Sequence, residues 1–427
     1  SRHVTLRMAA RTDQQANGFW SGVAGEMNQK FKNVRIELEQ YPGSEYVTKI
    51  VALSAGGAQP DVLEYSDVPF FEAAHKGLFL DLDPFVQRDR RALNTDDFFP
   101  GVIDFWRWDP QTKIRGRGKL YGLPRSAGTE IVVFNKQVFR QAGVAEPPAD
   151  GNWTWADFFD RCVKLTERQG DELVRAALPL PSITNCIGWL VSNGAPLLAD
   201  TTKRAGTLNN PTTVQVLQTV ANYRLKDRIS PLASETRSGG RFSGSNYDLL
   251  ARGTYAMILN IGFQTNIRQA FKDDPAGWDI AHMPKGPKGP AARAGWAPFA
   301  AGAQTKYQAE AWEFMKFATG PDGQSLLAEL KFLPPIRKSV ATSPTFADPG
   351  TPQHEERWIE AKRYEHFEPL CEVYPKLEQV YGYYWGQINN EGTRRPVNEA
   401  LRLADEVVNK VFQGGDLPAD WEGLPRQ

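Results

Sequence analysis

The sequence predicts an α/β fold built from more than one domain. Segments with the two-residue alternation of strands lie between segments with the spacing of helices, which is typical of βαβ units and a mostly parallel sheet with helices on both faces. The chain has 427 residues, and because domains of about 150 residues are typical, two or three domains are expected. A chain of this length needs neither a disulfide nor a metal to fold, since it buries about three quarters of its unfolded surface.

The first third of the chain shows the strand and helix alternation most clearly. Strands are predicted at residues 4–10, 34–41 and 60–66, the second of them alternating apolar and charged side chains as a half-exposed strand does. A helix is predicted from Ser44 to Leu53. Another helix face is predicted by apolar residues at four-residue intervals: Phe19, Val23, Met27 and Phe31. Because ligands bind beyond the carboxyl ends of parallel strands, the loops after these strands are candidate binding loops.

A second α/β region follows. Residues 131–134 and 254–260 are predicted strands, Thr154 with Asp157 predicts a capping box, and Asn210 with a following proline predicts a helix start. The Pro- and Gly-rich residues 283–298 predict a loop or crossover. Further helices are expected at these stretches: 309–330, 375–388 and 396–412.

Composition excludes several classes of protein. Fifty Lys and Arg balance fifty Asp and Glu, whereas a protein that binds nucleic acid or an anionic membrane needs a basic excess. No stretch approaches 18 consecutive apolar residues, so no membrane span is predicted. The three cysteines form no CxxC pair, which allows at most one disulfide and gives no zinc spacing, and no histidine pair suggests a metal site. We therefore expect no metal and no cofactor.

Common catalytic motifs are absent from the sequence. It contains no GxSxG, HExxH, P-loop or EF-hand pattern. Gly116, Gly118 and Gly122 only superficially match a dinucleotide fingerprint, because a Leu-Pro pair follows where a helix should open. Paired carboxylates for glycoside hydrolysis can come from any two strand ends, so a two-lobed glycoside-active enzyme stays an alternative.

Five blocks in order resemble the extracellular solute-binding proteins of bacterial ABC importers, specifically family 1, the maltose-binding-protein-like family. The blocks are residues 50–85, 119–158, 249–263, 309–340 and 397–411. The resemblance implies a periplasmic-binding-protein-like fold of type II, with two α/β lobes joined by hinge strands around a ligand cleft. It implies an N-terminal lobe of residues 1–126 plus about 300–342 and a C-terminal lobe of about 130–297 plus about 345–427. Hinge segments are expected near 126–130, 295–301 and 342–350.

The resemblance also implies ligand-binding positions and no catalytic residue. In the first lobe these are Arg11, Asp13, Ser44, Glu45, Tyr46, Tyr65, Ser66 and Asp67. Near the hinge and in the second lobe they are Arg125, Ser126, Gly128, Asn185, Gly262, Phe263, Trp296, Tyr381 and Trp385. Gly128 stands where an acidic ligand-contacting residue is similar in register, which argues against maltose itself. Among the 12 tryptophans, Trp296 is the foremost candidate for stacking on a sugar ring.

These features predict a monomeric, non-catalytic protein that captures a carbohydrate, either a mono- or an oligosaccharide, by lobe closure and delivers it to a membrane permease. The alternative ligand is a glycerol phosphate or a glycerophosphodiester, for which Arg11 and Arg125 supply the charge. No nucleic acid is expected as a partner. The chain starts without Met directly before a strand, which fits a removed signal peptide and a location in the periplasm or on the outer face of the membrane, free or lipid-anchored.

Overall fold

The computed structural model describes residues 3–12, 17–346 and 354–423, and its main sheet is built around three parallel strands. β1 pairs in parallel with β2 over its whole length and with β3, as the sequence predicted. β17 lies antiparallel to β3, and β7 pairs antiparallel with β17. The strands of this sheet are β1 (Val4–Thr12), β2 (Val34–Pro42), β3 (Val62–Glu64), β7 (Leu123–Thr129), β17 (Ala292–Ala301) and β18 (Glu365–His366).

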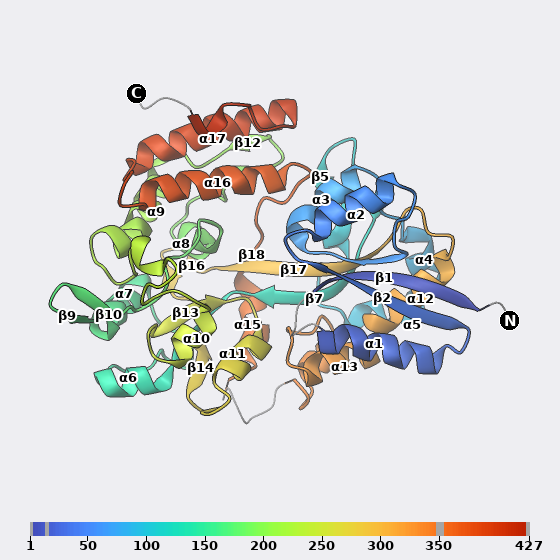
Figure 1. The fold of residues 1–427 in the computed structure, drawn as a ribbon, viewed down its shortest axis with the longest axis horizontal. Coiled ribbons are helices and arrows are strands. Elements are labelled where there is room, and N and C mark those ends of the chain that lie inside the picture. The colour runs from blue at the N-terminus through green and yellow to red at the C-terminus, as the bar shows by residue number, and fades with distance from the viewer. Residues whose placement is uncertain (1–2, 13–16, 347–353, 424–427) are drawn as a thin grey trace.

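Helices cover this sheet in the right-hand half of the molecule (Figure 1). They are α1 (Asn17–Lys30), α2 (Tyr46–Ala55), α3 (Asp67–His75), α4 (Asp83–Arg88), α5 (Arg90–Leu93), α12 (Gln308–Ala318), α13 (Pro321–Glu329) and α14 (Lys338–Ala341). A small sheet of β4 (Arg107–Asp109), β5 (Ile114–Arg115) and β6 (Lys119–Leu120) packs beside α3. α1 buries the predicted apolar face with Phe19, Val23 and Met27 in the core, and α2 starts two residues later than predicted.

The second sheet has β8 (Ile131–Asn135) between β13 (Met257–Asn260) and β14 (Trp278–Ala281), and both neighbours run antiparallel to it. Here the expected repetition of parallel βαβ units is wrong. A short, fully buried apolar strand looks the same in sequence whichever way its neighbours run, so residues 131–134 carried no signal for direction.

The left-hand half of Figure 1 holds the remaining elements. Its helices are α6 (Lys136–Ala142), α7 (Trp155–Leu165), α8 (Ile187–Ser192), α9 (Pro211–Leu225), α10 (Asn246–Ala251), α11 (Gln264–Ala270), α15 (Arg357–Glu360), α16 (Tyr374–Asn389) and α17 (Val397–Gly414). Its hairpins are β9 (Glu167–Gln169) with β10 (Glu172–Arg175), β11 (Ala199–Asp200) with β12 (Ala205–Gly206), and β15 (Lys285–Gly286) with β16 (Gly289–Pro290). The capping box at Thr154 and the Asn210 cap of α9 are both present, as predicted.

Two long strands cross the middle of the molecule and connect its halves (Figure 1). β7 is followed after the single residue Glu130 by β8, and β17 pairs with β7 from Ala294 to Phe299. Most of β17 lies in the stretch 283–298 that the sequence predicted as a loop or crossover, and its second half coincides with the expected hinge segment near 295–301. The strand tolerates its proline because the register shifts between Ala297 and Pro298, which is a bulge where no ladder hydrogen bond is needed.

The three cysteines are buried and unbonded. Burial raises the pKa of the Cys371 thiol to about 12 and raises the pKa values of the Cys162 and Cys186 thiols well above their ordinary value. Because the thiolate is the reactive species, we expect Ellman's reagent to label no cysteine in the native protein and all three after denaturation. Labelling of one thiol in the native protein would contradict this burial. Within the described ranges, no helix is long and apolar enough to span a membrane.

Candidate functional site

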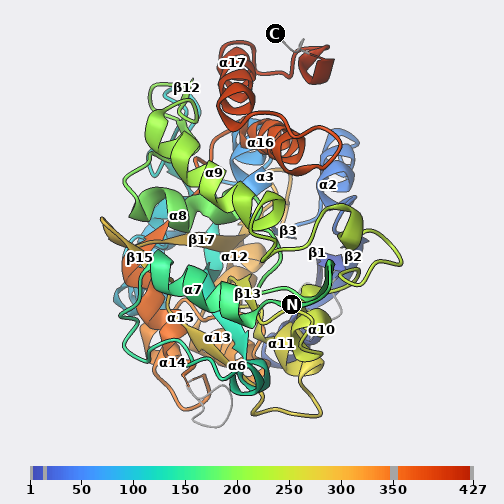
Figure 2. The same ribbon diagram turned by 90° about the vertical axis from the view of Figure 1, so that its left-hand side faces the viewer.

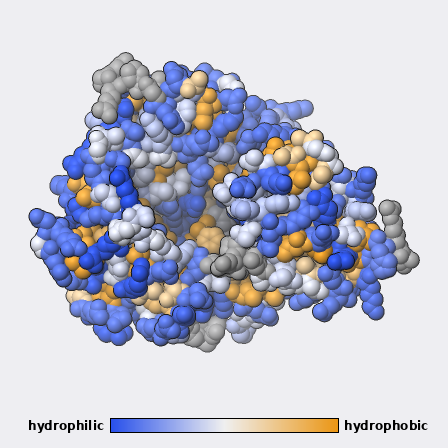
Figure 3. Space-filling view, viewed as in Figure 1, coloured by the Kyte–Doolittle hydropathy of each residue, from blue (hydrophilic) through white to orange (hydrophobic). Residues whose placement is uncertain are grey.

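A cavity of about 670 Å³ lies at the carboxyl ends of β1, β2 and β3, where the strand order predicts ligand binding. Its walls come from the ends of β1 and β3, the start of α3, the middle of β7 and β17, and the loop after β13. Figure 3 shows the surface hollowed between the two halves of the molecule. Its volume is within the range typical of small-molecule sites.

Seven of the predicted ligand-binding residues line this cavity: Arg11, Ser66, Asp67, Arg125, Ser126, Phe263 and Trp296. They come from five separate segments, which the fold brings together. Ser44 and Glu45 are exposed next to Gly43, which also lines the cavity. Asp13 lies outside the described residues.

Four predicted aromatic residues lie elsewhere. Tyr46 is buried under β1 and its hydroxyl donates to the Ala9 carbonyl oxygen at 3.0 Å, while Tyr65 packs edge-on against it in the core. Both side chains are buried in the core and do not reach the cavity. On α16, the hydroxyl of Tyr381 donates to Leu198 O and the Trp385 Nε1 donates to Pro181 O, at 3.1 and 3.0 Å. Neither lines the cavity, because that face of α16 packs on its own half of the molecule.

The two predicted glycines have a steric role. A Cβ placed on Gly128 would lie 2.1 Å from the carbonyl oxygen of Ile261, so the close approach of β7 to the loop after β13 requires glycine there. Gly262 has φ +114°, which favours glycine, and a Cβ there would strike Pro334. Both positions therefore shape the cavity through the backbone and present no side chain to a ligand.

A buried carboxylate holds two guanidinium groups at one wall of the cavity. Arg11 Nε donates to Glu64 Oε2 at 3.0 Å and a second nitrogen donates to Oε1, while Arg125 Nη2 donates to Oε1 at 3.2 Å. Although burial raises the pKa of Glu64, the charges of the two arginines hold it below its ordinary value. Glu64 is 1% exposed. It is therefore ionised and fixes the direction in which both arginines present their remaining N–H groups.

A second charged cluster lies across the cavity on β17. Arg293 Nε donates to Glu368 Oε1 at 2.6 Å, and Tyr374 donates to the other oxygen of Glu368. The side chain of Asn185, another predicted residue, donates to Glu130 beside Arg293. Burial raises the pKa of Glu130 to about 7, although Arg293 opposes the shift. Asn185 therefore does not line the cavity, and its contact near the site is the hydrogen bond to Glu130.

Aromatic side chains form the remaining walls. Trp296 lies against Phe105 and Phe367, with ring centroids 5.0 and 4.5 Å apart. On the other side, the Arg125 guanidinium lies over the rings of Trp20 and Phe332, at 5.1 and 5.7 Å. The cavity therefore combines flat apolar rings with fixed polar groups. This combination suits a ligand that has both C–H faces and hydroxyl groups.

Comparison with known proteins identifies the family. The sequence profile of the bacterial extracellular solute-binding proteins matches residues 23–353. The chain belongs to this family. It is 26% identical over 343 residues to the arabinooligosaccharide-binding protein of Bacillus subtilis, an alignment that covers 76% of this chain and 72% of the relative.

Solved structures of solute-binding proteins share the fold. The substrate-binding protein Lmo0181 of Listeria monocytogenes, in complex with cycloalternan, superposes with a TM-score of 0.81 at 19% identity and covers 97% of this chain and 99% of its own. UgpB of Mycobacterium tuberculosis, in complex with glycerophosphocholine, superposes with a TM-score of 0.78 at 17% identity, covering 96% and 98%. The type II binding-protein fold predicted from the sequence is therefore confirmed.

Sequence reasoning missed several residues that line the cavity of this solute-binding protein: Trp20, Glu64, Arg293 and Phe332. A signal existed for Glu64, because a carboxylate at the end of an otherwise apolar strand needs a buried partner. Arg293 fell within a segment predicted as a loop, and nothing in the local pattern marked Trp20 or Phe332. Among the described residues, no cluster of three or more His, Cys, Asp or Glu is arranged to hold a metal ion.

Asp67 should make the stability of this protein pH-dependent. Burial, together with the charge of Glu368, raises the pKa of Asp67 to about 7 from 3.8, although Arg293 opposes the shift. Because the folded state holds this proton more tightly than the unfolded state, the stabilising contribution is complete below pH about 4 and is lost as the pH rises towards 7. Between pH about 4 and 7 the parent protein should lose about 2 kcal/mol of its free energy of unfolding through Asp67. The Asp67→Asn variant should not show this loss when the free energy is measured by urea unfolding at each pH. An unchanged slope in the variant would contradict the assignment.

Proposed function

We propose that this protein is the substrate-binding component of an ABC importer, and that it captures a neutral carbohydrate in the cavity and delivers it to a membrane permease. Family membership supports a solute-binding role, and the relative from Bacillus subtilis is named for an arabinooligosaccharide. The observation that carries the proposal is the pairing of every cavity-lining arginine with a buried carboxylate, beside flat aromatic walls.

This pairing favours an uncharged ligand. Arg11 and Arg125 share Glu64, and Arg293 is held by Glu368. A guanidinium that is already neutralised gains little from a phosphate but still donates hydrogen bonds in a fixed direction, which is what a sugar hydroxyl needs. The rings of Trp296 and Phe263 supply apolar surface for the C–H faces of sugar rings.

Capture by lobe closure is part of the proposal. The proposed lobes are residues 1–126 plus about 300–342 and about 130–297 plus about 345–427, with hinges near 126–130, 295–301 and 342–350, of which residues 347–350 lie outside the described part of the chain. Contacts that join the proposed lobes would have to break on opening. Thr265 Oγ1 donates to Lys331 O at 2.9 Å, and Lys331 and Arg268 both pair with Glu355. Opening of the cavity would separate Thr265 from Lys331.

In this proposal the protein is a monomer that binds its ligand without catalysis. It works on the outer side of the cytoplasmic membrane. Its proposed ligand-binding residues are those that line the cavity, with Arg11, Asp67 and Arg125 as hydrogen-bonding groups and Phe263 and Trp296 as apolar walls. The proposal includes export by a removed signal peptide, after which the protein is either free or lipid-anchored next to its permease.

The alternative ligand is a glycerol phosphate or a glycerophosphodiester. Three arginines at one cavity are the observation that favours it, and a phosphate could bind if it displaced the carboxylates from them. Glycoside hydrolysis is the alternative of another class, because carboxylates line the cavity.

A thermal-shift screen distinguishes these alternatives. The panel holds arabinose, arabinotriose, maltotriose, glycerol 3-phosphate and glycerophosphocholine. A ligand at 100 times its dissociation constant should add about 2.7 kcal/mol of stability and raise the melting temperature. We expect a shift with a neutral saccharide and none with the phosphates. A shift with the phosphates alone would overturn the proposal, and so would release of hydrolysed sugar during long incubation.

A further inference from the structure

A second cavity, as large as the first, lies on the outer side of the left-hand half of the molecule. It has a volume of about 670 Å³ and runs between α7 and α9, with α8 and the β15–β16 turn at one end. Figure 2 turns this face, with α7, α8 and α9, toward the viewer. We call it the α7–α9 groove. None of its lining residues lines the cavity between the halves.

One wall of the α7–α9 groove is aromatic and rigidly held. Trp155 stacks on Trp189 with ring centroids 4.1 Å apart and planes inclined by 22°, and Phe159 stacks on Tyr223 at 5.8 Å. Hydrogen bonds fix the indole rings, because Trp155 Nε1 donates to Ser192 Oγ at 2.7 Å and Trp189 Nε1 donates to the Tyr223 hydroxyl at 3.3 Å. Trp155 and Phe159 are only partly buried. Two stacked pairs thus offer flat apolar surface to the groove.

The polar side chains of the groove come from α9, the helix that also carries the lining residues Val216 and Tyr223. Thr212, Gln215, Thr219 and Asn222 line the groove at intervals of three and four residues, which places them along one side of the helix. At a rise of 1.5 Å per residue, Thr212 and Asn222, which are ten positions apart, are separated by about 15 Å along the helix. The groove is therefore elongated, with amide and hydroxyl groups along α9 and rings from α7, α8 and the end of α9.

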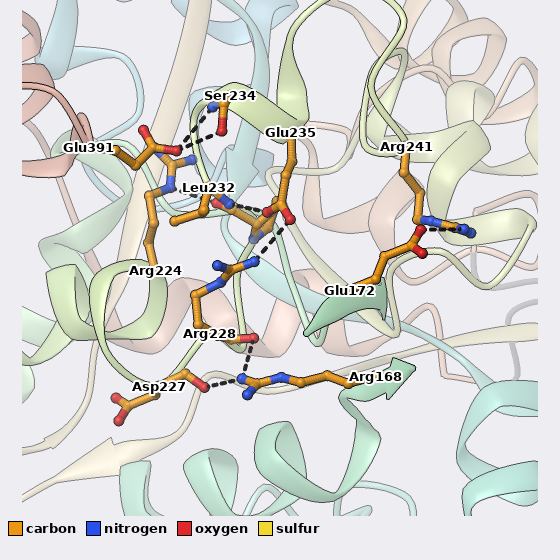
Figure 4. A network of polar contacts seen from close by, with 11 residues as sticks. Arg168, Glu172, Arg224, Asp227, Arg228, Leu232, Ser234, Glu235, Arg241 and Glu391 are labelled. Carbon is orange, nitrogen blue, oxygen red and sulfur yellow. Dashed lines mark hydrogen bonds and ion pairs between the residues drawn. The ribbon is translucent and has the colours of Figure 1, made fainter. Parts of the chain in front are cut away.

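The far end of the groove carries its charge. Asp227 is the charged residue among the described residues that line it. Arg168 fixes the chain at this point by donating to the carbonyl oxygens of Asp227 and Arg228, at 2.8 and 3.3 Å. Figure 4 shows these bonds, and no dashed line meets the Asp227 carboxylate there. A carboxylate at the end of a groove is an acceptor for hydroxyl groups and repels a phosphate.

We propose that the α7–α9 groove is a second carbohydrate site, which takes a short chain of neutral sugar rings. The rings of Trp155 and Phe159 would stack on C–H faces, while Gln215, Asn222 and Asp227 would bind hydroxyl groups. A helix from a partner protein fits less well, because an apolar helix face would leave the polar side chains of α9 buried without hydrogen bonds. An anionic ligand lacks a cation among the lining residues.

The experiment first removes binding in the cavity between the halves. Failure of the proposed function can then be distinguished from failure of the proposed site in the α7–α9 groove. Native electrophoresis is run with Trp296→Ala protein in gels that contain soluble arabinan or glycogen, and titration of intrinsic fluorescence uses arabinotriose and maltotriose. The gels detect a segment of polysaccharide, and the titrations detect a free oligosaccharide. We expect at least one of these probes to bind, and Trp155→Ala in the same background to weaken it at least about tenfold.

Three further variants complete the test. Gln215→Ala, which removes only an exposed amide, should weaken the same binding by roughly threefold without a change in melting temperature. Thr219→Arg should block the groove from its exposed wall. Trp421→Ala, which removes a partly exposed ring far from the groove, should leave binding unchanged. Binding that survives both Trp155→Ala and Thr219→Arg would overturn the proposal. Absence of binding to all four probes would also overturn it. So would a Trp155→Ala variant that loses permease-dependent uptake although no saccharide binds the groove, because the groove would then be a contact site for a protein.

Discussion

Replacing Glu64 by glutamine should abolish tight ligand binding and lower the free energy of unfolding by about 3–5 kcal/mol. Glu64 is fully buried and holds both Arg11 and Arg125 at the wall of the cavity. The neutral amide leaves two guanidinium charges near each other in the protein interior and loses the acceptor that orients them. Affinity should fall at least roughly 100-fold. Isothermal titration with the saccharide found in the screen, and urea unfolding, measure the two effects.

Glu39→Gln is the matched control for Glu64→Gln. Glu39 pairs with Arg7 at 2.5 Å on the same sheet, but both side chains are partly exposed, at 18% and 34%. An exposed pair contributes about 0–1 kcal/mol, so this variant should bind normally and unfold almost as the parent does. If Glu64→Gln is as mild as Glu39→Gln, the arginines do not depend on Glu64 for their position and the proposed role of the pair is wrong.

Replacing Trp296 by alanine should abolish saccharide binding in the cavity between the halves and cost about 3–5 kcal/mol of stability. Its ring is 5% exposed and packs against Phe105 and Phe367 while it lines the cavity. The backbone N–H of residue 296, which donates to Asp67 at 3.2 Å, stays in the variant. The substitution therefore removes the ring alone. Trp296→Phe keeps an aromatic face and should retain part of the affinity.

Trp312→Ala separates loss of stability from loss of binding. Trp312 is fully buried in α12, and its Nε1 donates to Asp89 at 2.7 Å, away from the cavity. We expect this variant to lose as much stability as Trp296→Ala and to bind the saccharide unchanged, with both measured at a temperature where each protein is folded. Equal weakening of binding in the two variants would show that Trp296 acts only through the stability of the fold.

The sequence predicted those parts of the fold that depend on local pattern. The parallel strands at residues 4–12, 34–42 and 62–64, the capping box at Thr154 and the two last helices follow from periodicity and capping. Two features did not follow from local pattern: the strand direction in the second sheet and the strand through Pro298. Pairing partners and bulges are decided by contacts between residues far apart in sequence.

The candidate site was predictable where a loop follows a parallel strand. Arg11, Ser66 and Asp67 were found in this way, and they line the cavity. The same loops also gave Tyr46 and Tyr65, and the resemblance gave Tyr381, but all three are buried in the core, because sequence does not tell which side chains near a strand end or on a helix are turned inward. Glu64 and Arg293 escaped detection because their partners, Arg11, Arg125 and Glu368, are brought to them only by the tertiary fold. Which of the predicted residues contact the ligand stays a prediction.

Glu130 affects how the two halves of the molecule can rotate relative to each other. It is the single residue between β7 and β8, its N–H donates to Arg293 O at 2.8 Å, and its side chain accepts from Asn185. Bending of the chain at this point must turn a buried carboxyl group within its hydrogen bonds. These hydrogen bonds oppose a small rotation of one half against the other, and a larger rotation requires that they be exchanged for others. The halves should therefore rotate between discrete angles and not bend gradually.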